Sequence, residues 1–404
     1  MNHRTIITAT LLSVLVSGLQ AAGTTKAGPG PAPAARANAI AFRFYAEESA
    51  KPGNIFFSPY SLYTAFAMTY EGARGKTARE IASVFSFPAG TAGLRRSLAG
   101  LRKDLAAAAK GAEFEQANSF WAQEDYKFLP AYLKTLRGSY GAEARRADFK
   151  NRTEEARGEI NDWTETRTKG KIKDLFPEGS LDPLSRLVLV NAVYFKGTWE
   201  TPFDKDMTSD ADFTTGEGKV KVRMMAAPGA RQAEYSEDGE LQALRLPYKG
   251  GGLSMLVLLP GEGKNLADTE KLLTAERLES IRKNLAKQKV KVFLPKFTFN
   301  SGFILNGALA KLGMPAAFSE AAADFSGMDG TDKLYIQKAF HKAFVEVNEE
   351  GTEAAAATGV AMGVKSMAFD FALFRADRPF LFFIEERKTG LILFMGRMEN
   401  PLRL

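Results

Sequence analysis

Cysteine is absent from the 404 residues of this sequence. The fold therefore cannot depend on disulfide bonds, and a lipid anchor attached through a cysteine near the N-terminus is excluded. Histidine is almost absent too, since the chain contains only His3 and His341. Because nucleophilic hydrolysis usually needs a positioned base, most often histidine, this scarcity argues against a catalytic protein.

Motifs of common enzymes are also missing. The sequence has no Gly-x-Ser-x-Gly elbow, no His-Glu-x-x-His motif and no glycine-rich phosphate loop. A single internal histidine offers no triad, and in isolation His341 is more often a hydrogen-bonded core residue than a catalyst. We expect a protein that is not an enzyme and that needs neither a cofactor nor a metal.

A strong excess of charge of one sign is lacking. The 54 basic and 47 acidic residues give a net charge of +7, or +6 (7 − 1) if Arg4 is removed with a leader. No basic and aromatic nucleic-acid motif occurs, so nucleic-acid binding is not expected. The densest basic group lies on a predicted helix over 92–110 and is best interpreted as a solvated helix face. It consists of Arg95, Arg96, Arg102 and Lys103.

Long apolar runs are missing, except for a short one near the N-terminus. Residues 6–16 are apolar, follow His3 and Arg4, and precede small residues, which predicts a secretory signal peptide over 1–22. The run is too short to span a bilayer, and no other run approaches that length. Residues 23–35 are predicted to be a Pro/Ala/Gly-rich spacer, and 36–404 a single domain. We expect the protein to be secreted or periplasmic.

Helical and strand patterns are mixed along the chain without strict alternation, which predicts an α+β fold. Helices are expected over 35–49, 59–71, 78–85, 92–110, 129–136, 153–166 and 303–312. Strands are expected over 114–121, 187–195, 255–259, 290–294 and 344–347. Ser58-Pro59 provides a capping residue followed by a proline in the first helical turn.

The most informative segment follows the strand over 344–347. It reads Glu349-Glu350-Gly351-Thr352-Glu353-Ala354-Ala355-Ala356-Ala357-Thr358. In an extended conformation Thr352, Ala354, Ala356 and Thr358 share one face, and Glu353 lies on the other. Such a ribbon of small residues could enter between existing strands. Taken alone, an alanine-rich helix or linker is an equal alternative, because alanine is the best helix former.

This segment resembles the hinge of inhibitory serpins, the serine protease inhibitors that insert a reactive loop into a central sheet. Residues 58–77, 191–199, 374–384 and 394–397 also resemble serpin motifs, and the resemblance extends over 35–404. It implies the serpin fold, with a large mixed central β-sheet, further sheets, about eight or nine helices and an exposed reactive loop at about 350–374.

The resemblance also implies residues that control opening of the sheet. His341 would hold the sheet closed where it must part, together with Ser58, Ser61 and Asn191. Lys296 and Glu349 would form an ion pair where the loop enters, contributing about 0–1 kcal/mol if exposed. Trp199 would lie in the same region; an ordinary buried aromatic is the alternative, and both can be true.

The reactive bond can be located by counting. In serpins it typically follows the residue fourteen places after the hinge glycine, which gives Lys365 (351 + 14), with Ser366 across the bond. The distance from Ser366 to Pro379 is then 13 residues (379 − 366), a familiar serpin loop length. A lysine suits the acidic pocket of a trypsin-like protease. Met362 and Met367 leave a chymotrypsin- or elastase-like specificity open.

The resemblance therefore implies a monomeric inhibitor that forms a covalent acyl complex with a trypsin-like serine protease. The competing class is a non-inhibitory serpin that acts as a binding or chaperone protein. Such members commonly carry bulky, charged or proline residues in the hinge, whereas 351–359 has none beyond Glu353. In some serpins a basic helix in the region of 92–110 binds sulfated polysaccharides, so weak polyanion binding there is a further expectation.

Overall fold

The computed structural model describes residues 32–331, 333–351 and 371–403. The predicted signal peptide, most of the spacer, the hinge residues from Thr352 to Thr358 and the bond between Lys365 and Ser366 lie outside these ranges. None of the described helices is long and apolar enough to cross a membrane.

The described residues form ten α-helices, one π-helical turn and one 3-10 turn. The helices are α1 Pro33–Glu48, α2 Pro59–Gly72, α3 Gly75–Val84, α4 Thr91–Ala108, α5 Pro130–Thr135, α6 Thr153–Arg167, α7 Leu266–Lys271, α8 Ala275–Asn284, α9 Asn306–Lys311 and α10 Ser326–Asp329, with η1 Leu136–Tyr140 and η2 Pro315–Phe318. The serpin fold expected from the sequence is confirmed. The helix count is slightly above expectation because α7, α9 and α10 are short.

Two sheets organise the fold. The first has five strands in the order β11-β12-β4-β2-β3, namely Phe297–Ile304, Lys338–Val347, Leu187–Gly197, Ala112–Gln123 and Glu143–Ala147. The second has ten strands, β1 Ile55–Phe57, β15 Ile392–Met398, β14 Phe380–Glu386, β9 Leu253–Pro260, β8 Leu241–Pro247, β7 Arg231–Glu237, β10 Ala286–Pro295, β6 Gly218–Ala226, β5 Asp204–Thr215 and β13 Ala372–Arg375. The first sheet is mixed. The pairs β12–β4 and β2–β3 are parallel, whereas the pairs β11–β12 and β2–β4 are antiparallel.

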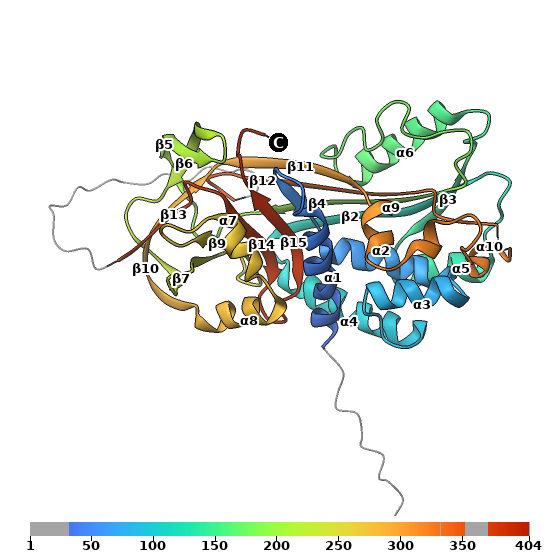
Figure 1. Ribbon diagram of the computed structural model, residues 1–404, viewed down its shortest axis with the longest axis horizontal. Helices are drawn as coiled ribbons and strands as arrows, with labels where there is room; N and C mark the ends of the chain where they lie inside the picture. Colours follow the sequence, from blue (N-terminus) through green and yellow to red (C-terminus); the bar gives the residue numbers. More distant parts are fainter. Residues whose placement is uncertain (1–31, 332, 352–370, 404) are drawn as a thin grey trace, which may run out of the picture. The chain divides into compact units, whose positions relative to one another are not determined.

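Alternating side chains of β4 fill two separate cores. Leu187, Leu189 and Val193 belong to the large core that α2 also enters, whereas Val188 and Val190 belong to a smaller core under α6. The first sheet is therefore covered on both faces, with α6 on the side opposite α2 (Figure 1). Burial on both faces explains the continuous apolar run of β4, since a strand without a solvent face needs no alternation.

One helix prediction was wrong at its start. The sequence predicted a helix over 303–312, but α9 begins at Asn306. Phe303 and Ile304 instead end β11, where they pair with His341 and Phe340 of β12. Pairing with a neighbouring strand outweighed the local helical spacing, as tertiary context often does.

Candidate functional site

The parallel pairing of β4 with β12 is the centre of the candidate site. Eight residue pairs join the two strands in register, from Lys338 opposite Val188 to Val345 opposite Phe195. We call this ladder the β4–β12 seam. Gly351 follows β12 closely, and the next strand that the structure describes is β13, which pairs with β10 in the second sheet. The undescribed segment 352–370 therefore connects the end of the seam to the other sheet.

His341 lies in the middle of the seam, directly opposite Asn191. Its side chain is fully buried. The Nε2 atom accepts a hydrogen bond from the backbone N–H of Ser58 at 3.0 Å. The proton therefore resides on Nδ1, which donates to Oδ1 of Asn191 at 2.5 Å. Burial lowers the pKa of His341 from 6.5 to about 3, so the imidazole is neutral.

Asn191 extends this polar contact across the sheet. Its Nδ2 donates to Oγ of Ser61 at 2.6 Å and also to Oδ1 of Asn118. Asn118 lies opposite Asn191 on β2, so the polar row crosses β12, β4 and β2. Sequence reasoning missed Asn118; the signal was an asparagine inside the predicted strand over 114–121.

Ser58 joins the polar row to the second sheet. Its Oγ donates to the carbonyl of Leu393 on β15 at 2.6 Å and accepts from the N–H of Ser61 at 3.1 Å, which caps α2. The four residues that the resemblance placed at the opening of the sheet therefore lie together. Because every one of them is fully buried and hydrogen-bonded, the cluster can hold strands in place but offers no base to a substrate.

Trp199 lies at the loop end of the seam, just beyond β4. It is buried, and its ring stacks on Tyr248 with centroids 4.6 Å apart. Its Nε1 donates to the carbonyl of Asn348 at 3.0 Å, and its backbone N–H donates to the carbonyl of Glu350 at 2.9 Å. Trp199 is thus both a buried aromatic and a direct contact of the hinge.

Glu349 is held from two sides. Lys296 Nζ lies 3.1 Å from its carboxylate, and the N–H of Phe203 donates to its carbonyl at 2.7 Å. The contribution expected from the sequence was that of an exposed ion pair, but only Lys296 is exposed, whereas the Glu349 side chain is 7% accessible. Burial alone would raise the pKa of Glu349, but hydrogen bonds from its backbone, Thr208 and Lys296 lower the pKa below its usual value.

Glu350 and Gly351 are the last residues of the hinge that the structure describes. The buried carboxylate of Glu350 forms an ion pair with Lys205 of β5, a contact that sequence reasoning missed. Gly351 has φ +133°, and a Cβ there would lie 2.2 Å from the carbonyl oxygen of Gly197. Only glycine fits this backbone conformation and this close approach.

The predicted basic face of α4 is only partly available. Arg95 makes two hydrogen bonds to the buried carboxylate of Glu71, at 2.7 and 2.6 Å, and Tyr140 donates to the same group. Arg96 and Lys103 are exposed and Arg102 is half-buried. Arg95 therefore serves the packing of α4 on α2 and η1, which leaves fewer free charges than the sequence suggested.

Comparison with known proteins places this geometry in context. The family model described as serpin (serine protease inhibitor) matches residues 35–401. The chain is 43% identical to an uncharacterized serpin-like protein of Thermococcus kodakarensis over 90% of this chain and 84% of that protein. It is 40% identical to the human leukocyte elastase inhibitor, over 88% and 95% of the two chains.

Solved structures agree. Human thyroxine-binding globulin in complex with its ligand superposes with a TM-score of 0.83 at 31% identity, over 91% of this chain and 98% of that one. Uncleaved ovalbumin gives 0.83 at 30% identity, over 92% and 100%. A five-stranded sheet with a buried, hydrogen-bonded histidine on β12, and a segment of small residues after that strand, thus occurs in a chain that matches one family along nearly its whole length: the chain belongs to the serpins.

Proposed function

We propose that the protein inhibits a trypsin-like serine protease by kinetic trapping. The protease would attack the bond between Lys365 and Ser366 and become acylated through its serine. The cleaved loop would then enter the β4–β12 seam and carry the enzyme with it. The observation that carries this proposal is the parallel seam itself, with the small-residue segment attached to its end.

The direction of the strands supports insertion. A segment that turns back at Gly351 runs opposite to β12, and therefore also opposite to β4. It would replace one parallel ladder by two antiparallel ones, which are slightly more stable per residue. Thr352 to Lys365 comprises 14 residues (365 − 352 + 1), enough to span the eight pairs of the seam.

The gain in free energy supports trapping. Each added backbone hydrogen bond contributes about 0.5–1.5 kcal/mol, and apolar burial adds about 25 cal/mol per Å². Over a dozen residues the sum is on the order of 10 kcal/mol or more, enough to distort a protease active site. The intact form would persist because opening the seam first breaks the buried contacts of His341 and Asn191, so a kinetic barrier protects it.

The test is incubation with trypsin followed by a denaturing gel. We expect a covalent complex band, and a released C-terminal peptide that begins at Ser366. Thr352→Arg should convert the inhibitor into a substrate, because a large charged side chain on the inward face obstructs insertion. Glu353→Arg is the matched control on the outward face and should keep most of the inhibition. Full inhibition by Thr352→Arg would refute the inward assignment.

A non-inhibitory binding role is the second candidate. It is favoured by the fit to thyroxine-binding globulin, which was solved in complex with thyroxine. In that case trypsin would cut the loop cleanly, no covalent band would form, and the melting temperature would not rise after cleavage. The absence of bulky residues from the segment after Gly351 favours inhibition. Secretion and a monomeric state remain parts of the same proposal.

A further inference from the structure

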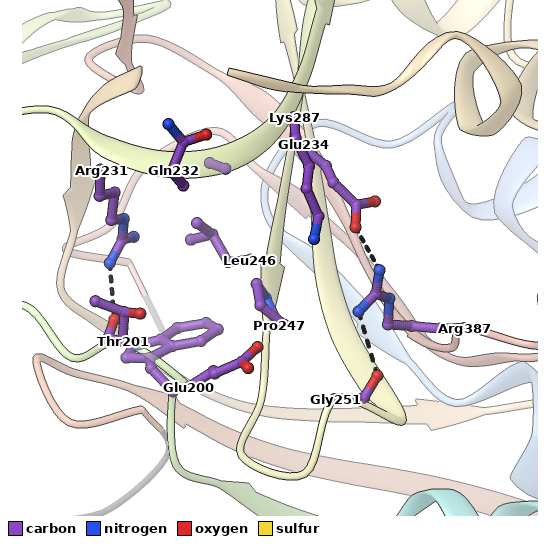
Figure 2. Close-up of a pocket in the computed structure, with 12 residues that line it drawn as sticks. Glu200, Thr201, Arg231, Gln232, Glu234, Leu246, Pro247, Gly251, Lys287 and Arg387 are labelled. Atoms are coloured by element: carbon purple, nitrogen blue, oxygen red, sulfur yellow. Dashed lines mark hydrogen bonds and ion pairs between the residues drawn. The ribbon is translucent and has the colours of Figure 1, made fainter. Parts of the chain in front are cut away.

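A pocket of about 340 Å³ lies behind the loop end of the seam. Figure 2 shows its walls: Leu246 and Pro247 of β8 in the centre, Arg231 on one side, and Lys287 and Arg387 on the other. Trp199 also lines it. The volume falls within the range of small-molecule sites, which combine apolar walls with a few polar groups.

The acidic groups around the pocket are largely neutralised by arginines. Glu234 forms ion pairs with Arg245, at 2.8 Å, and with Arg387. Behind them Glu385 contacts both Arg245 and Arg282. Because Arg282 also forms an ion pair with Glu279, three guanidinium groups share three carboxylates, and this network is neutral overall. The remaining lining carboxylate, Glu200, is exposed.

Arg231 has no carboxylate partner among the residues that the structure describes. Its Nη1 donates to the carbonyl of Thr201 at 2.8 Å, and its guanidinium lies over the ring of Phe203, 4.2 Å from the centroid. Burial lowers the pKa of Arg231 to about 10, and no nearby acid opposes this effect. Arg231 is half-buried, so its guanidinium is partly desolvated without a counter-ion, and an anion in the pocket would offset that cost.

Lys287 supplies a second cation. Its side chain points into the pocket in Figure 2, and no ion pair joins its ammonium group to an acid in the described part of the chain. Lys289, two residues further along β10, is exposed and does not line the pocket. The two lysines therefore have the same chemistry and different positions, which makes them a matched pair for experiment.

We propose that this pocket binds a small organic anion, with a flat apolar body and one carboxylate, sulfate or sulfonate group. The body would lie against Leu246, Pro247 and Trp199. The acid group would contact Arg231, and Lys287 on the opposite side of the pocket would add a longer-range attraction. The apolar wall favours such an amphipathic molecule over an inorganic ion, and the small volume favours it over a polymer.

A ligand bound in this pocket would also affect the β4–β12 seam. This extension rests on the proposed function. The segment 199–203 contributes Trp199 and Thr201 to the pocket and, on its other side, binds the hinge through Trp199 and Phe203. A ligand that fixes Arg231 also fixes this segment in the closed form. Since a ligand shifts an equilibrium only toward the state it binds better, the ligand should slow loop insertion.

The binding experiment uses the intact protein and 2-naphthalenesulfonate, measured by calorimetry. The neutral 2-naphthol and inorganic sulfate test the two halves of the ligand separately. We expect the sulfonate to bind and each partial probe to bind at least about tenfold more weakly, since each lacks one contact set. Equal binding of 2-naphthol would overturn the role of the cations, and equal binding of sulfate would overturn the apolar site.

Variants locate the site. Arg231→Gln should weaken sulfonate binding about tenfold, the factor of one charge-assisted hydrogen bond. Lys287→Gln should weaken it about threefold or more, and Lys289→Gln should leave it unchanged. Because Arg231 also donates a hydrogen bond to Thr201, the melting temperature of Arg231→Gln is measured first. If that temperature is lowered, the comparison of Lys287→Gln with Lys289→Gln tests the site. Equal effects of the two lysine variants would overturn the proposal.

The regulatory extension is separated from the inhibitory function by its readout. Saturating sulfonate should lower the rate at which cleaved or heated protein converts to the inserted form, and Lys287→Gln should need about threefold more sulfonate for the same effect. If binding occurs and the rate is unchanged, the extension fails while the site stands. If no covalent trypsin complex forms at all, the proposed function fails, and the binding result remains valid by itself.

Discussion

The middle and the loop end of the β4–β12 seam are stabilised by different kinds of interaction. In the middle, His341, Asn191 and Ser58 are fully buried, neutral and hydrogen-bonded without any charge. At the loop end, two carboxylates are buried but their partners Lys296 and Lys205 are 44% and 57% exposed. The buried hydrogen bonds in the middle should therefore be sensitive to protonation, whereas the partly exposed ion pairs at the loop end should be sensitive to salt.

This difference suggests a division of roles. The polar row in the middle would set the height of the barrier to opening of the seam, because each buried polar group left without a partner costs about 1–3 kcal/mol. The loop end would set where opening begins, because ion pairs with exposed lysines contribute little. Four predictions test this contrast, and each is read out as the rate at which the intact protein loses inhibition just below its melting temperature.

The largest effect is expected from His341→Ala. The change leaves the N–H of Ser58 and Oδ1 of Asn191 without partners, which should lower the barrier by about 3 kcal/mol and speed inactivation more than a hundredfold. Asn38→Ala is the control, because Asn38 is also buried and makes two hydrogen bonds, to Gly390 and Ile392, away from the seam. Similar acceleration by both variants would contradict a special role of the seam.

Acid should act on the same contact. The pKa of His341 is about 3 in the closed seam and returns toward 6.5 when the ring meets water. The opened form therefore binds a proton that the closed form excludes, so closure is fully favoured above about pH 6.5 and loses up to about 1.4 kcal/mol per pH unit between 6.5 and 3. Inactivation should accelerate as pH falls through this window. His341→Gln should flatten the profile; an equally steep profile would exclude His341 as its source.

Trp199→Phe tests the loop end. It removes the hydrogen bond to the carbonyl of Asn348 and keeps the aromatic ring against Tyr248, so a loss of about 1 kcal/mol is expected. Trp163→Phe is a matched control, since Nε1 of Trp163 is buried without a hydrogen-bond partner in the structure described. Trp163→Phe should have almost no effect, and a larger effect than Trp199→Phe would refute the assignment.

The smallest effect belongs to Lys296→Gln. The pair with Glu349 is half exposed, so its loss should cost less than about 1 kcal/mol and should matter less at high salt. Lys311→Gln, which breaks the pair with Glu47 far from the hinge, should change nothing. If high salt accelerated inactivation of the Lys296→Gln variant as strongly as that of the unchanged protein, the assignment of salt sensitivity to this pair would be wrong.

Much of the site could be predicted from the sequence. Ser58, Ser61, Asn191 and His341 lie in motifs that the serpin resemblance made readable, and the structure brings them together. The serpin fold was predicted correctly for the same reason. Lys365 and Ser366 lie outside the described residues, so the reactive bond stays a prediction.

The contacts that were missed share a physical cause. Asn118 meets Asn191 across 73 residues, and Trp199 meets Asn348 across 149. Such pairs depend on strand register, which no local periodicity encodes. The pocket was missed for the same reason, since Arg231, Lys287 and Arg387 come from three strand ends that are distant in the chain. Burial of Glu349 was missed because a charged residue at a strand end is usually exposed.

Ser58 links three elements of the fold. Its backbone and hydroxyl bind β12 of one sheet, β15 of the other, and the first turn of α2. A fluctuation that releases His341 therefore leaves Ser58 with an unpaired amide at the point where three elements meet. Amide hydrogen exchange at Ser58, Ser61 and Leu62 should then proceed in a single concerted event, so the three elements behave as one mechanical unit.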